Sequence, residues 1–178
     1  QDPKMGTAPR MTVAENLLIA KFRGEKRGLF PRQLYRYKEE FQATIEKVGN
    51  GLEKHLDTPI EFLSGGQRQA LTLAMATLVR PKILLLDEHT AALDPKTSDM
   101  VMNLTRKIVE EQKLTTLMIT HNMEHAIEYG NRLVMLYHGK IVVDVQGEEK
   151  KNLTVAELME LFHKNSGQVL NDDALVLG

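Results

Sequence analysis

The sequence predicts an α/β protein, in which a layered core of mostly parallel strands with flanking helices is joined to a helical subdomain. Two observations support this. After residue 80, short apolar runs alternate with helix-like segments, as in strands joined by crossover helices. Before residue 80, apolar residues recur mainly at helical spacing. We therefore expect a helical subdomain at residues 1–79, an α/β core at 80–162 and a weakly ordered tail at 163–178.

Composition is that of a globular domain. The 178 residues are 42% hydrophobic and 26% charged, and a net charge of -1 gives no reason to expect nucleic acid as a partner. The absence of cysteine excludes a disulfide framework and is compatible with a reducing compartment. The longest aliphatic run, residues 83–86, is far shorter than the ~20 residues of a membrane span, and no charged-then-apolar leader opens the sequence. These features predict a soluble, cytosolic chain.

Helix signals dominate the first part of the chain. A capping box at Thr12 predicts a helix that ends near Gly24. A second helix is expected from Pro31 to the turn at residues 49–51. Residues 21–38 carry a local charge of +6. Such segments are most often solvated faces, and docking to acidic loops of a membrane protein or to lipid headgroups is the alternative.

A glycine-rich turn opens the next predicted helix. Ser64 has the position of an N-cap, with Gln67 three residues later, and the helix should run to about Val79. Unpaired N–H groups at a helix start favour an anion, and Gly65 and Gly66 would let the backbone approach a phosphate closely. Alone, this turn predicts no more than a capped helix.

Two carboxylates follow the apolar run at residues 83–86, which we expect to be a strand buried on both faces. Asp87 and Glu88 therefore stand at the carboxyl end of a strand, where open α/β sheets hold ligands. By themselves they are as compatible with a solvated rim as with a site. Their position after the glycine-rich turn favours a catalytic pair.

The remaining elements complete the predicted core. Pro95 opens a helix, and the residues expected on its inward face are Met100, Val101, Leu104, Ile108 and Val109. A hairpin turn is expected at residues 138–139, and a last helix is capped at Thr154. Further strands are expected at residues 115–120, 133–137 and 141–145.

Together these motifs resemble those of ABC-type ATPases, over nearly the whole chain. Leu63 to Gln69 resembles the signature motif, and Ile83 to Glu88 resembles the Walker B segment. Asp94, within Ala91-Ala92-Leu93-Asp94-Pro95, resembles the D-loop aspartate. His121 follows an apolar strand and resembles the switch histidine. Gln1 resembles the Q-loop glutamine. The resemblance implies a partial ABC-type P-loop ATPase core with its helical subdomain.

The resemblance also implies a role for each residue in the hydrolysis of ATP. Asp87 would organise Mg²⁺ through water, and Gln1 would reach the same ion. Glu88 would activate the attacking water as general base. His121 would sense the γ-phosphate and help to fix Glu88.

A second group of residues would act across a dimer interface. Ser64, Gly65, Gly66 and Gln67 would cap the γ-phosphate of ATP held by a second copy, and Asp94 would lie at the interface. The resemblance thus implies a head-to-tail homodimer with two shared sites.

One expected motif is absent, since no G-x-x-x-x-G-K-[ST] phosphate loop occurs in the 178 residues. The first residue is Gln1 instead of Met, so we expect a fragment of a longer protein. Phosphoryl transfer depends on positioning and charge neutralisation, so this chain alone should bind ATP poorly and hydrolyse almost none. His89 stands where the family commonly has Pro or a small residue, and we interpret it as subfamily variation.

The function that the resemblance implies is that of the ATP-binding subunit of an ABC transporter, of the bacterial importer type. Its partners would be a second ATP-binding subunit, membrane permease subunits and, as a further option, a solute-binding protein. It would lie in the cytoplasm, on the inner face of the cell membrane. The alternatives are a non-transport ABC ATPase acting on ribosomes or DNA, and a binding module that lends its signature motif to an active partner.

Overall fold

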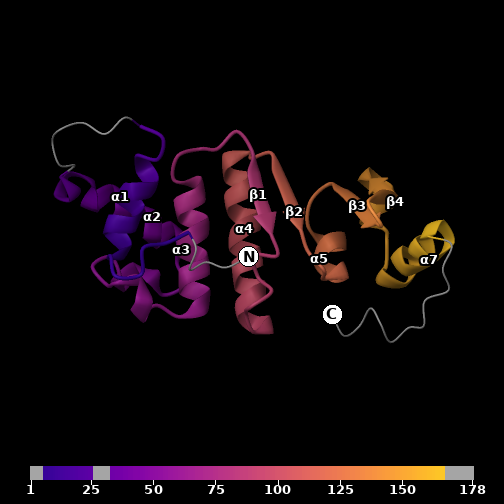
Figure 1. The fold of residues 1–178 in the computed structure, drawn as a ribbon, viewed down its shortest axis with the longest axis horizontal. Helices are drawn as coiled ribbons and strands as arrows, with labels where there is room; N and C mark the ends of the chain where they lie inside the picture. Colours follow the sequence, from indigo (N-terminus) through magenta and orange to yellow (C-terminus); the bar gives the residue numbers. More distant parts are fainter. Residues whose placement is uncertain (1–5, 26–32, 167–178) are drawn as a thin grey trace. The chain divides into compact units, whose positions relative to one another are not determined.

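Helices form the first part of the chain and short strands follow them (Figure 1). A computed structural model defines residues 6–25 and 33–166 of the protein. The chain divides into two compact units, residues 1–118 and 119–178, which are described separately below. The boundary expected at residue 80 separates a helical subdomain from an α/β core. It stays a prediction.

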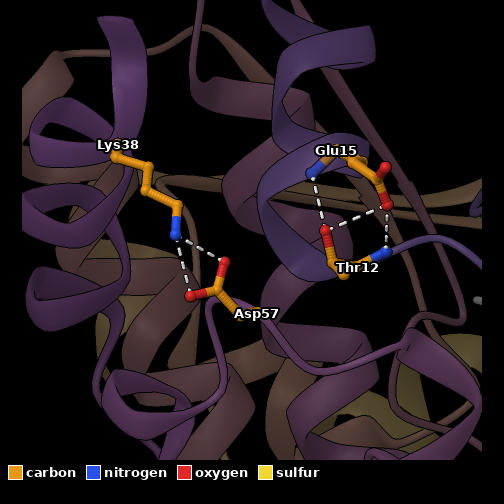
Figure 2. A network of polar contacts seen from close by, with 4 residues as sticks. All are labelled: Thr12, Glu15, Lys38 and Asp57. Carbon is orange, nitrogen blue, oxygen red and sulfur yellow. Dashed lines mark hydrogen bonds and ion pairs between the residues drawn. The ribbon is translucent and has the colours of Figure 1, made fainter. Parts of the chain in front are cut away.

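Helix α1 (Val13–Lys21) begins at the predicted capping box. Thr12 Oγ1 accepts a hydrogen bond from the Glu15 N–H at 3.2 Å, and Glu15 Oε2 accepts one from the Thr12 N–H at 2.7 Å (Figure 2). The same figure shows an ion pair of 2.8 Å between Lys38 Nζ and Asp57. Lys21 pairs with Glu40 at 2.7 Å, so two lysines of the basic segment 21–38 have acidic partners within the helical subdomain.

The second helical segment begins with a 3-10 turn, η1 (Leu34–Tyr37), and continues as α2 (Lys38–Val48). Its expected start at Pro31 lies outside the described residues. The helix ends as predicted, because Gly49, Asn50 and Gly51 all have positive φ angles (66°, 59° and 76°), which no helix can accommodate. Two short 3-10 turns follow, η2 (Leu52–Lys54) and η3 (Ile60–Phe62).

Helix α3 (Gly65–Thr77) is buried on two sides and joins two hydrophobic cores. Ala70 and Leu71 pack into the core of the helical subdomain, which includes Phe41 of α2. Leu73 packs against Leu84 of the first strand in a second core. A helix with apolar residues around most of its circumference is stable only between two layers, and this position is what α3 has.

Strands β1 (Leu84–Asp87) and β2 (Thr116–Ile119) pair in a parallel sheet, with helix α4 (Pro95–Gln112) as the connection between them. The prediction that the first strand is buried on both faces is wrong. Leu84 and Leu86 are buried, whereas Ile83 is 51% and Leu85 65% exposed. Among the described residues, the core around Leu73 covers only one face of the strand, and the alternation of side chains leaves the other face to solvent.

Most of the expected inward face of α4 is confirmed, because Val101 is buried and Leu104, Ile108 and Val109 pack against the core around Leu73. Met100, however, is 44% exposed, so its predicted inward position is wrong. Met102 and Thr105, which were not expected on this face, are buried as well, and α4 contacts α3.

Up to Ser166, where the described part of the second unit ends, the chain forms a β-hairpin and three helices. They are α5 (Met123–Glu128), β3 (Arg132–Tyr137), β4 (Lys140–Gln146), α6 (Gly147–Lys151) and α7 (Val155–Ser166). The predicted hairpin turn is confirmed, with positive φ at both His138 (47°) and Gly139 (74°). Leu158 of α7 packs on the hairpin core. Helix α7 reaches Ser166, four residues into the expected tail. In the described ranges, no helix combines the length and apolar composition that crossing a membrane requires.

Candidate functional site

The glycine-rich turn at residues 64–67 forms the amino terminus of α3. Ser64 Oγ accepts from the Gln67 N–H at 3.2 Å, and Gln67 Oε1 accepts from the Ser64 N–H at 3.0 Å, which closes a capping box. Ser64 and Gly65 are exposed, and Gly66 is buried. The capping box leaves the hydroxyl proton of Ser64 available for donation, at a helix end whose dipole favours an anion.

The turn at residues 49–51 and the first turn of α4 both contact this glycine-rich turn. Asn50 Nδ2 donates to the carbonyl oxygen of Gly66 at 3.2 Å, and Gln67 Nε2 donates to that of Gly51 at 3.5 Å. The left-handed turn at residues 49–51 therefore supports the start of α3. Gly66 also packs against Thr97, in the first turn of α4.

Asp87 is the last residue of strand β1 and Glu88 follows it, so both lie at the carboxyl end of the strand, as expected. Asp87 is exposed and Glu88 is half-buried. Glu88 has φ 44°, a left-handed conformation that is rare for a residue with a side chain. Its carbonyl oxygen accepts from the Ala91 N–H at 3.1 Å, so a tight turn begins at Glu88 and directs the chain away from the sheet.

Asp94 ends the loop after this turn and caps α4. Its Oδ1 accepts from the Thr97 N–H at 3.1 Å. Hydrogen bonds from the side chain and backbone of Thr97 lower the pKa of Asp94, because they stabilise the carboxylate. Asp94 is exposed, and a Cβ placed on Gly65 would lie 3.5 Å from Cδ2 of the preceding Leu93. The glycine-rich turn and the loop that ends at Asp94 are thus neighbours within the first unit.

Two further candidates are His121 and Gln1. His121 belongs to the second unit, exposed between β2 and α5. Thr120 Oγ1 accepts from the Asn122 N–H at 3.0 Å, and Asn122 caps α5, so His121 lies in an ordered turn. Gln1 lies outside the described residues. In the part of the chain that the structure covers, no three His, Cys, Asp or Glu side chains gather as a metal site.

Sequence reasoning missed two buried polar residues near these motifs. Asn16 of α1 is 1% exposed, and its amide makes hydrogen bonds to the backbone of residues 8–12. His89 is 7% exposed, and its Nε2 lies 3.1 Å from Thr105 Oγ1. No local signal marks either residue as buried, because both depend on contacts with other segments.

Comparisons with known proteins point to one family. Residues 1–91 match a family model described as ABC transporter. A tyrosine transport ATP-binding protein of Clostridioides difficile is 52% identical over 163 residues, which are 91% of this chain and 64% of that protein. A thiamine import ATP-binding protein of Photobacterium profundum is 34% identical, over 84% of this chain and 61% of its own length.

Solved structures give the same result. The ATP-binding cassette MJ0796, in a dimeric post-hydrolysis state bound to ADP and Pi, matches with a TM-score of 0.60 and 29% identity, over 79% of this chain and 58% of that one. The ADP conformation of the cassette MJ1267 matches with a TM-score of 0.65 and 25% identity, over 86% and 63%. The chain thus spans about three fifths of the length of the proteins that it matches. It belongs to the ABC transporter family of ATP-binding proteins.

Proposed function

We propose that the protein carrying these residues is the ATP-binding and ATP-hydrolysing subunit of an ABC importer. The observation that carries the proposal is the 52% identity to a tyrosine transport ATP-binding protein over 91% of the chain. Tyrosine is therefore the first solute to test.

Two carboxylates at the end of β1 would carry the chemistry. Glu88, which is half-buried, takes a proton from the attacking water as general base. Asp87, which is exposed, holds Mg²⁺, whose charge would neutralise the phosphates. Mg²⁺ commonly uses one or two carboxylates, with water and substrate phosphates as the other ligands, and a lone Asp87 fits that pattern. Gln1 is proposed as a further ligand, and His121 as the sensor of the γ-phosphate.

The exposed start of α3 would act on a second copy. The Ser64 hydroxyl and the N–H groups of Gly65 and Gly66 would donate to the γ-phosphate of ATP bound by that copy, with Gln67 fixing Ser64 through the capping box. Asp94 would lie at the same interface, since Leu93 is close to Gly65. The dimeric state of a solved relative supports this arrangement.

The rest of the assembly follows from the same relatives. Permease subunits would cross the membrane, this subunit would lie on its cytoplasmic face, and a solute-binding protein would deliver the solute. The 178 residues include no phosphate loop. We therefore expect calorimetry of the 178-residue chain with Mg-ATP to show no tight binding, and micromolar affinity would contradict this part of the proposal.

The decisive experiment uses the complete protein that carries these residues. Glu88→Gln should lower ATP turnover by at least about a hundredfold, because general-base catalysis contributes about that much. The variant should also accumulate as an ATP-bound dimer, measured by light scattering. Glu110→Gln, at an exposed position of α4, is the matched control and should retain normal turnover. Normal turnover by Glu88→Gln would refute the proposal.

A further inference from the structure

His89 is a buried polar residue directly after the proposed general base. Only 7% of it is exposed, and its Nε2 lies 3.1 Å from Oγ1 of Thr105, which is 5% exposed on α4. Buried polar groups that form a hydrogen bond are costly to disrupt, since the group left behind has lost both its partner and water. This pair therefore constrains where the backbone at residue 89 can lie.

The direction of the hydrogen bond follows from the Thr105 hydroxyl. Its single proton goes to the carbonyl oxygen of Val101, at 2.8 Å, one turn back along α4. The same oxygen can then only accept from His89, so Nε2 carries a proton and donates. The geometry thus assigns His89 the Nε2–H form.

The backbone beside His89 needs such support. Glu88 has φ 44°, and a residue with a side chain stays in this region only when its surroundings hold it there. The turn closed by the Ala91 N–H and the Glu88 carbonyl, 3.1 Å apart, has His89 as its second residue. The buried hydrogen bond between His89 and Thr105 of α4 stabilises that turn.

The whole loop between β1 and α4 is fastened at two points. His89 bonds Thr105, and Asp94 bonds the Thr97 N–H at 3.1 Å. These two threonines are eight residues apart, which is about 12 Å along a helix. The loop is therefore hydrogen-bonded to α4 at two points about two helical turns apart. Glu88 is the first residue of this loop, directly after β1.

We infer that His89 is a positioning residue, which by donating to Thr105 fixes the left-handed turn at Glu88 and thereby aims the Glu88 carboxylate. This inference rests on the proposed function, because it needs Glu88 to be the base. His89 itself contacts neither nucleotide nor water in this role. The loss of the hydrogen bond should misdirect the base and leave nucleotide binding intact.

The first test is spectroscopic and uses the complete protein. Long-range ¹H–¹⁵N NMR spectra of the histidine rings should show His89 protonated at Nε2, and Thr105→Val should shift that signal. A neutral ring protonated at Nδ1 would overturn the inference, whatever the activity of the protein.

The second test separates positioning from packing. His89→Ala and Thr105→Val should each lower kcat about tenfold with little change in KM for ATP, and the double variant should be no slower than either single one. His89→Gln and Thr105→Ser, which keep the donor and the acceptor, should restore most of kcat. Thr77→Val is the matched control, because Thr77 is also 5% exposed and donates to the Leu73 carbonyl at 2.9 Å. It should retain normal kcat.

Measuring Glu88→Gln under the same conditions distinguishes failure of the positioning inference from failure of the proposed function. If Glu88→Gln is inactive while His89→Ala and Thr105→Val keep normal kcat, the positioning inference is overturned and the proposed function stands. If Glu88→Gln turns over normally, both are overturned. Should His89→Ala fail to fold, the comparison of Thr105→Val with Thr105→Ser decides by itself.

Discussion

Gly66 in the signature turn and Thr97 in the first turn of α4 pack so closely that a Cβ at residue 66 would overlap Cγ2 of Thr97. Two motifs that are 31 positions apart in sequence are thus in direct contact. Packing against Thr97 therefore requires a glycine at residue 66, whether or not a ligand also approaches it.

Gly66→Ala should therefore destabilise the protein by about 1–3 kcal/mol, the usual cost of overpacking. Thr97→Ser removes Cγ2 and keeps the hydroxyl, so the double variant should recover most of the loss. Urea denaturation of the four proteins measures this. Equal stability of Gly66→Ala and wild type would show that the turn can move aside.

Asn16 should contribute far more to stability than an exposed polar residue on a helix would. Its side chain accepts from the Ala8 N–H at 2.8 Å and donates to the carbonyl oxygens of Ala8, Met11 and Thr12. Asn16→Ala should cost about 3 kcal/mol, because it leaves several backbone groups without partners. Asn103→Ala, on the exposed side of α4, is the control and should cost no more than about 0.5 kcal/mol in the same thermal unfolding assay.

The same substitution should cost far more stability at one of two neighbouring leucines of β1 than at the other. Leu86 is 8% exposed and Leu85 is 65% exposed. In the 178-residue chain, Leu86→Thr should cost about 3 kcal/mol, since it removes buried apolar volume and buries a hydroxyl. Leu85→Thr should change stability by less than about 0.5 kcal/mol and reduce self-association, measured by ultracentrifugation. Similar costs at both positions would mean that the outer face of the strand is covered.

Lys150 should make the stability of the second unit depend on pH in the alkaline range. The residue is 3% exposed, its Nζ donates to the Ile127 carbonyl, and burial lowers its pKa below the ordinary value of 10.5. The unfolded chain therefore binds more protons than the folded one between these two pKa values, so the contribution of Lys150 to stability rises with pH across that window.

Urea denaturation between about pH 8 and about pH 10 tests this expectation. The stability of the wild type relative to Lys150→Met should increase with pH. The exposed Lys140→Met is the control, and it should show the same pH dependence as the wild type. A difference between wild type and Lys150→Met that does not change with pH would contradict the lowered pKa.

Local signals in the sequence predicted local structure well. The capping boxes at Thr12 and Ser64 form as expected because both partners lie within four residues of each other. The turn at His138 and Gly139 forms because two positive φ angles match the twist of the flanking strands. The fold class and the family followed from the order of such signals.

Packing between segments could not be predicted in the same way. Met100 and Leu85 are apolar and in regular elements, yet both are exposed, because burial depends on which other layers are present. Asn16 and His89 are polar and buried, because backbone groups and a hydroxyl from other segments satisfy them.

The sequence by itself determined the motifs, their order and the elements that carry them, since each is encoded within a few residues. Only the tertiary structure decided that the Gly66 turn lies against Thr97, that Glu88 adopts a left-handed backbone and that His89 reaches Thr105. The physical reason is that these relationships join side chains from different elements. Their energies depend on distances that exist only once the helices and strands have packed together.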